Sequence, residues 1–185
     1  MRKTIKDICE ISTGVYEKPT VGGTVFYIQS RDFNDYLELG ESMSPELQED
    51  PKLKKHYLRK GDILVAAKGG NYFAAVFNEE IQPAVASSTF IVLRGLDKTQ
   101  VLLGFLAWFL NHPKTQLYLS LNSKGSNISY ISKTLIMDME IDLPSLETQQ
   151  RILEIHQLRM QEKKLVHRIE ALKEIMINEK LIRTL

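Results

Sequence analysis

Residues 141–152 read Ile-Asp-Leu-Pro-Ser-Leu-Glu-Thr-Gln-Gln-Arg-Ile, and the 33 residues that follow contain neither glycine nor proline. The first three residues complete an extended strand, which Pro144 ends. Ser145 is a favourable N-cap, and Glu147 suits the positive first turn of a helix. This stretch therefore predicts a last strand joined directly to a helix of about forty residues, roughly 60 Å long.

The predicted helix, residues 145–185, carries an apolar stripe. Apolar side chains fall at heptad a and d positions, interrupted only by the polar Glu162. These side chains are Ile155, Leu158, Leu165, Ile169, Leu172 and Met176. Because a single protruding helix cannot bury such a stripe against itself, we expect it to form a coiled coil with a partner helix. The alternative is a surface helix that folds back on its own domain.

Residues 1–144 are enough for one compact domain with its own core. Short strand-like runs such as residues 63–67 and 89–93 are separated by turns, and helices are expected near residues 100–111 and 113–121. The runs do not repeat a βαβ pattern. We therefore expect the α+β class, with a mixed or antiparallel short-strand domain followed by the long coiled-coil-forming helix.

Composition restricts location and partners. The formal net charge is +1, so a nucleic-acid binder would need a local basic stripe or a basic partner. The single Cys9 excludes an internal disulfide and fits a reducing compartment. The N-terminus lacks a signal-peptide pattern, and the apolar run 101–110 is too short to span a bilayer. We expect a cytoplasmic protein with no membrane contact.

Catalysis has little support in the sequence. The four histidines, at positions 56, 112, 156 and 167, do not have the spacing of a metal site or a triad. Gly69–Gly70 is expected to lead into a strand rather than a helix, so it lacks the context of a phosphate-binding loop. The single Glu-x-Lys element, at Glu162, lies on the predicted coiled coil. We expect no metal, no cofactor and no enzymatic activity.

Three predicted loops combine basic, amide, small and aromatic residues. Lysine and arginine suit phosphates, amide side chains suit base edges, and glycine allows close approach of the backbone. The candidate DNA contacts are Gln29, Arg31, Lys68, Gly69, Asn71, Tyr72, Lys124, Ser126, Asn127 and Tyr130. We expect phosphate contacts from the two lysines and base-edge or stacking contacts from the asparagines and tyrosines, with Gln29 and Arg31 on the same face. Many polar loops have a similar composition, so the loops alone leave the function open.

The order of several segments points to a family. Segments 26–33, 60–69, 83–94 and 124–132 resemble the target-recognition domain of type I restriction–modification specificity subunits, and segment 141–152 resembles the junction into their spacer helix. The resemblance implies a non-catalytic reader of one half of a split DNA sequence. It also implies antiparallel pairing of the long helices, and docking of methyltransferase (M) and restriction (R) subunits.

The chain departs from the family pattern in one respect. Specificity subunits usually contain two recognition domains and two long helices, whereas this chain has one of each. We therefore expect a half-length subunit or a fragment, dimerising through residues 146–185, with a palindromic split site as the consequence of two-fold symmetry. Two alternatives remain: a protein-interaction module that docks a partner through its helix without binding DNA, and a small nuclease or modification enzyme.

Overall fold

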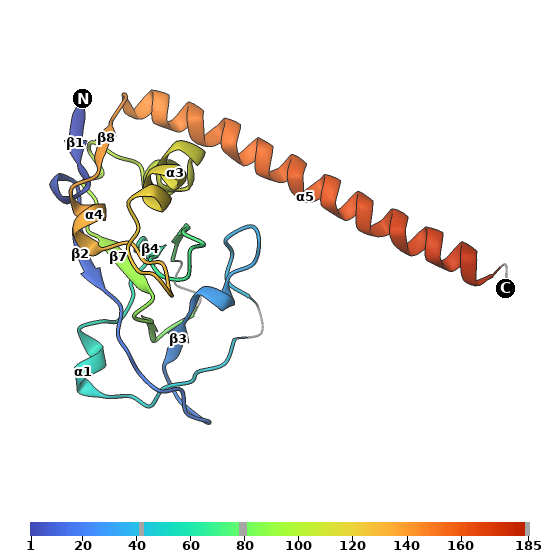
Figure 1. Cartoon of the computed structure of the whole chain (residues 1–185), viewed down its shortest axis with the longest axis horizontal. Coiled ribbons are helices and arrows are strands. Elements are labelled where there is room, and N and C mark those ends of the chain that lie inside the picture. Colours follow the sequence, from blue (N-terminus) through green and yellow to red (C-terminus); the bar gives the residue numbers. More distant parts are fainter. Residues whose placement is uncertain (41–42, 78–80, 184–185) are drawn as a thin grey trace.

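A computed structural model describes residues 1–40, 43–77 and 81–183 of the chain. A mixed domain of short strands and helices lies at one end, and a single long helix protrudes from it (Figure 1). The predicted α+β class is therefore confirmed.

The central sheet has four antiparallel strands. Their order is β2 (Glu10–Thr13), β7 (Phe90–Arg94), β4 (Ile63–Ala66) and β5 (Ala74–Val76). All four residues of β4 are buried, because it pairs with β7 and β5 and both of its faces are covered. Strands β4 and β5 form a hairpin, so Gly69–Gly70 is followed by a strand as expected.

Two smaller sheets complete the domain. Strand β1 (Arg2–Thr4) pairs antiparallel with β8 (Glu140–Asp142), and β3 (Phe26–Ile28) pairs in parallel with β6 (Ala84–Ala86). The first of these pairs places the N-terminus beside the strand that leads into the long helix (Figure 1).

Several short helices surround the sheets. They are η1 (Ile5–Asp7), η2 (Ser30–Asp32), α1 (Pro51–Lys54), α2 (Leu103–Asn111), α3 (Pro113–Leu121) and α4 (Lys133–Met137). Helix α2 begins three residues later than the start expected at residue 100. The reason is a local turn, in which the Thr99 amide donates to the Asp97 carboxylate at 3.0 Å and the Gln100 amide donates to the Asp97 carbonyl at 3.0 Å.

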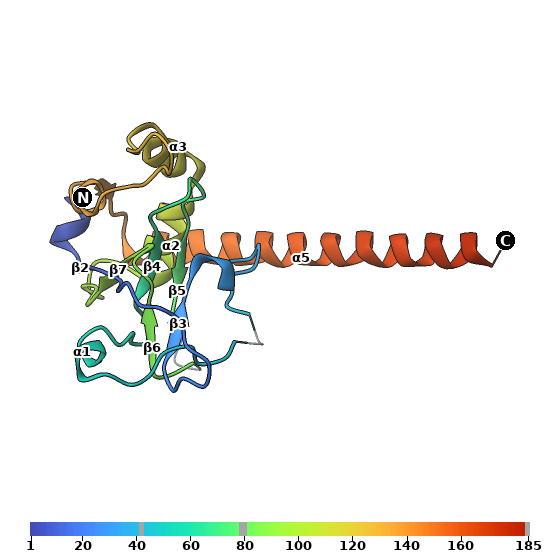
Figure 2. The ribbon, with the colours of Figure 1, turned by 60° about the horizontal axis from the view of Figure 1, so that its bottom comes forward.

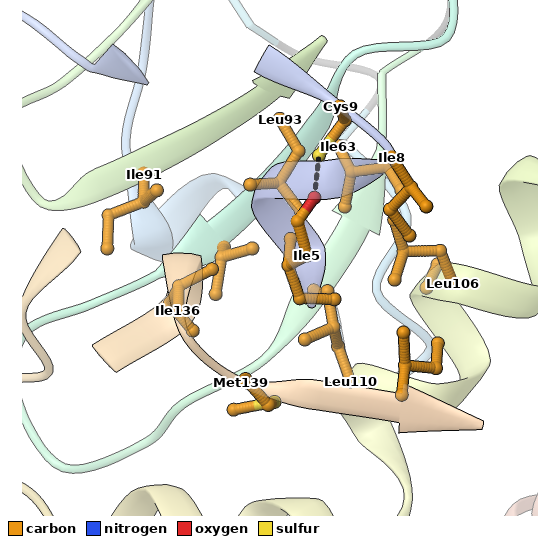
Figure 3. Packing of buried hydrophobic residues seen from close by; sticks show 14 of the residues in the cluster. Ile5, Ile8, Cys9, Ile63, Ile91, Leu93, Leu106, Leu110, Ile136 and Met139 are labelled. Carbon is orange, nitrogen blue, oxygen red and sulfur yellow. Dashed lines mark hydrogen bonds between the residues drawn. The ribbon is translucent and has the colours of Figure 1, made fainter. Parts of the chain in front are cut away.

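Apolar clusters cover both faces of the central sheet. Side chains along β4 alternate between the faces, so Ile63 and Val65 join one cluster and Leu64 and Ala66 the other. The larger cluster lies between the sheet, η1, α2 and α4 (Figure 3). The second contains the aromatic residues Phe73, Phe77 and Phe90.

Cys9 is part of the larger cluster, and burial raises the pKa of its thiol to about 12. Its Sγ atom lies 3.4 Å from the Ile5 carbonyl oxygen (Figure 3). Because the thiolate is the reactive form, we expect the folded protein to resist a thiol reagent at neutral pH and to react once unfolded. Absorbance with an aromatic disulfide reagent, with and without denaturant, measures this. Equal labelling rates in both conditions would contradict it.

Helix α5 (Leu146–Ile182) begins at the predicted N-cap, where Ser145 Oγ accepts from the Thr148 amide at 3.3 Å. Only its first turns pack closely on the domain, through Gln149, Ile152 and Leu153. The C-terminal part of the helix projects beyond the domain (Figures 1 and 2). Within the described residues, no helix is long and apolar enough to cross a membrane.

Candidate nucleic-acid interface

Two of the three predicted loops meet in the folded chain. The Gly69 amide donates to the Ser129 carbonyl at 2.9 Å, and the Ile131 amide donates to the Ala67 carbonyl at 2.9 Å. These bonds place Lys68 opposite Tyr130 in a short antiparallel bridge. Side chains that are some sixty residues apart in sequence thus form one surface, which we call the loop surface (residues 68–71 and 124–130).

The second half of the loop surface is a tight turn. The Lys124 and Tyr130 backbones exchange two hydrogen bonds of 2.8 Å each. Gly125 has φ +98°, and a Cβ atom there would lie 2.3 Å from the Ile128 carbonyl oxygen, so only glycine fits. The turn therefore holds Ser126 and Asn127 in exposed positions at its tip.

Tyr72 lies beneath this surface rather than on it. Its side chain is buried in the larger apolar cluster, and its hydroxyl bonds to the Ser129 hydroxyl. Ser129 Oγ in turn donates to Ser123 Oγ at 3.0 Å. This burial is inconsistent with the base or stacking contact expected for Tyr72. The residue instead links the two loops from beneath the surface, through its hydrogen bond to Ser129.

The other candidates in the loop surface are accessible. Lys68, Asn71, Lys124 and Tyr130 are all exposed. Gly69 is exposed as well, but its amide is already bonded to Ser129. Its contribution is a backbone turn with φ +96° rather than a free donor.

The first predicted loop is arranged differently. Gln29 Nε2 lies 3.4 Å from a Glu46 carboxylate oxygen, and Arg31 forms an ion pair with the same carboxylate at 3.5 Å. The Gln29 backbone amide donates to Asp32 at 2.6 Å and so caps η2. Both candidates are therefore engaged within the domain, although the Arg31 side chain is still 66% exposed.

Neighbouring residues connect this loop to the loop surface. The rings of Phe33 and Phe73 pack edge to face with centroids 5.3 Å apart. Ser30 and Asn71 line a common cavity of about 420 Å³, which Lys163 and His167 of α5 also line. The cavity thus lies between the long helix and the two loops that contain Ser30 and Asn71.

The apolar stripe of α5 faces away from the domain. The residues that contact the domain or line a cavity against it include Gln149, Leu153, Lys164 and His167. At 3.6 residues per turn, their mean direction is roughly 160° from that of the heptad positions. The six heptad side chains are 50–69% exposed, from Ile169 to Ile155. The helix therefore does not fold its stripe back onto its own domain.

Two contacts of α5 have little signal in the sequence. Gln149 is fully buried and joins the helix to the segment before α2. In the sequence, only its position four residues before Leu153, on the same face of the helix, indicates that it is buried. The second contact joins Lys164 to Tyr36 and Glu38, and sequence alone gives no indication of it.

A metal centre finds no support in the part of the chain that the structure describes. Among those residues, no group of three or more His, Cys, Asp or Glu side chains is placed to hold an ion.

Solved structures share this fold. A chain of a type I R-M system, from work on complex assembly and conformational transition, superposes with a TM-score of 0.70 at 19% identity, covering 97% of this chain and 43% of that one. The HsdS subunit from Thermoanaerobacter tengcongensis superposes with a TM-score of 0.62 at 20% identity, covering 88% and 37%. The S subunit from M. genitalium gives 0.57 at 16% identity, covering 85% and 38%.

Together the fold, the loop surface and the exposed helix define a mixed domain that carries a helical arm, and the chain spans less than half the length of these solved relatives. The family model for the type I restriction modification DNA specificity domain matches residues 1–171. The chain therefore belongs to this family, as the sequence resemblance implied. No curated protein matches it in sequence.

Proposed function

We propose that this chain acts as a specificity subunit, which reads one half of a split DNA sequence and positions methyltransferase and restriction subunits without catalysing a reaction itself. The observation that carries the proposal is the loop surface, where Lys68 and Lys124 lie beside exposed amide and aromatic side chains. Family membership supports the same assignment. Because the target is DNA, we place the protein in the cytoplasm.

Within residues 1–144, which we propose as the recognition domain, the roles divide by chemistry. The ammonium groups of Lys68 and Lys124 suit phosphates, which position the protein on the duplex. Asn71, Ser126 and Asn127 can hydrogen-bond to base edges, and the exposed ring of Tyr130 can contact a base or sugar. Gln29 and Arg31 would join this face only by leaving Glu46.

Residues 145–185 are proposed to pair with a second copy of the chain. The exposed heptad stripe supports this, since its direction leaves it free for a partner while the opposite face contacts the domain. Two identical recognition domains on a two-fold axis would read a palindromic split site. The paired helices would also offer the surface on which the M and R subunits dock.

Replacing Lys68 and Lys124 with alanine tests the DNA contact. Each lost phosphate contact should reduce the magnitude of the slope of log affinity against log salt concentration by about 0.9. Fluorescence anisotropy with a DNA site selected from a random pool, in the presence of the M subunit, measures both affinity and slope. Lys52→Ala, an exposed lysine of α1, is the matched control and should leave both unchanged.

An unchanged salt slope in the double variant would remove the two lysines from the interface. Failure of the wild-type protein to bind any DNA, alone or with the M subunit, would favour the alternative of a protein-interaction module. That alternative uses the same exposed stripe of α5 for docking.

A further inference from the structure

Helix α5 touches its own domain at a second place, far from its base. Lys164 Nζ lies 2.6 Å from Glu38 Oε1 and 5.0 Å from the centroid of the Tyr36 ring. The pair joins residues 126 positions apart in the sequence. It is the place where the protruding helix is tied to the turn of residues 34–38.

That turn is held rigid before the helix meets it. Asn34 Oδ1 accepts from the Tyr36 amide at 2.8 Å and from the Glu38 amide at 3.1 Å. The Asn34 amide donates to the Glu38 carbonyl at 2.9 Å. Leu37 adopts φ +62°, a strained value for a residue with a side chain, and packs against the second apolar cluster. Tyr36 and Glu38 are therefore presented at fixed positions.

Charge favours the contact. The hydrogen bond from Lys164 lowers the pKa of the Glu38 carboxyl, so the carboxylate is favoured when the helix is in place. The ring face of Tyr36 adds a cation–π attraction to the same ammonium group. At the level of this contact, the cavity lined by Asn71, Lys163 and His167 separates the helix from the loop surface.

The position of the contact along the helix makes it effective as a support. Lys164 lies 15 residues beyond Gln149, roughly 22 Å along the axis, and 18 residues before Ile182. A helix of this length that pivots about its base by about 4° moves its far end by roughly 4 Å, more than the 3.4 Å rise of one base pair. Even a weak contact at this distance from the base therefore determines the direction in which the whole of α5 points.

We propose that Lys164 is a positioning residue which, with Tyr36 and Glu38, fixes the angle between α5 and the loop surface and thereby sets the spacing at which two half-sites are read. This inference rests on the proposed function, because spacing has meaning only for paired recognition domains. Lys164 occupies a heptad c position, off the proposed seam, so it acts on the angle without taking part in helix pairing.

Two measurements on Lys164→Ala test the inference. The first uses selection from DNA libraries that hold the half-site constant and vary the spacer. Wild type should favour one spacer length, whereas the variant should lose about fivefold of its preference over lengths one base pair away, as expected for an exposed pair. The half-site sequence itself should be unchanged, which a general loss of folding would not produce.

The second measurement needs no DNA. Spin labels at Val21→Cys and Asn178→Cys, both exposed, report the distance between domain and arm, in samples diluted with unlabelled chain. The distance distribution should be narrow in wild type and broad in Lys164→Ala. The charge-swapped pair Glu38→Lys with Lys164→Glu should restore both the narrow distribution and the spacer preference. Lys173→Ala, whose ion pair lies within α5, is the control that should behave as wild type.

The outcomes separate the inference from the function beneath it. A wild-type protein that selects no split site would overturn the proposed function and the spacing role together. The positioning role alone would be overturned if wild type prefers one spacing and Lys164→Ala keeps both that preference and a narrow distance distribution.

Discussion

Replacing Leu165 and Leu172 with glutamate should convert a dimer of this protein into monomers. Both side chains occupy heptad d positions and are 62% and 52% exposed in the single chain. In a paired helix they would be buried, and each buried leucine contributes about 1.5–3 kcal/mol. With two such sites on each of two helices, the dissociation constant should rise at least about a thousandfold. Light scattering over a concentration series measures the change.

Ala171→Glu is the matched control for this substitution. It introduces one glutamate beside Leu172, at an exposed position that lies far from the heptad stripe around the helix. The control should remain a dimer. Monomeric wild type at high concentration, with its helix intact by circular dichroism, would count against self-pairing and in favour of a module that awaits a different partner.

The elements that sequence predicted well are those specified locally. The N-cap at Ser145, the glycine- and proline-free run behind it and the β4–β5 hairpin all depend on residues close together in the chain. The parallel pairing of β3 with β6 and the pairing of β1 with β8 join distant segments and leave no local pattern. Domain class could therefore be predicted, but strand order could not.

The candidate interface divides in the same way. Lys68 and Lys124 were predicted from composition, whereas their juxtaposition through Tyr130 depends on hydrogen bonds between distant loops. Burial of Tyr72 could not be inferred, because an aromatic ring next to glycines suits either a surface or a core. The engagement of Arg31 by Glu46 likewise depends on how the intervening loop folds.

Gln149→Glu should be the most destabilising single substitution among those considered. The side chain is fully buried, and its Oε1 atom accepts from the Leu102 amide at 2.8 Å. Its Nε2 atom donates to the carbonyl oxygens of Gln100 and Pro144, at 2.8 and 2.9 Å. A carboxylate of the same shape would place an oxygen with no hydrogen to donate against those two carbonyl oxygens. Each unsatisfied buried group costs about 1–3 kcal/mol, so the free energy of unfolding should fall by about 3 kcal/mol or more.

The neighbouring Gln150→Glu is the matched control. That side chain is exposed and bonds only to Glu154, so its replacement should change the free energy of unfolding by a few tenths of a kcal/mol, about the size of a like-charge pair on a helix. Chemical denaturation followed by circular dichroism at fixed pH compares the two variants. Equal stability of both would show that the Gln149 contacts do not hold the helix to the domain.

The pH dependence of Gln149→Glu follows from the same burial. Burial away from water raises the pKa of a carboxyl above its value in the unfolded chain, so the folded state binds the proton more tightly. Stability relative to wild type should therefore recover as pH falls, because a protonated carboxyl can donate to one of the two carbonyl oxygens, and it should be lost as pH rises. A stability difference that does not vary between acid and alkaline conditions would mean that water reaches the site. In that case the first turns of α5 would be held less tightly to the domain. The direction of the helix would then depend more on the contact at Lys164.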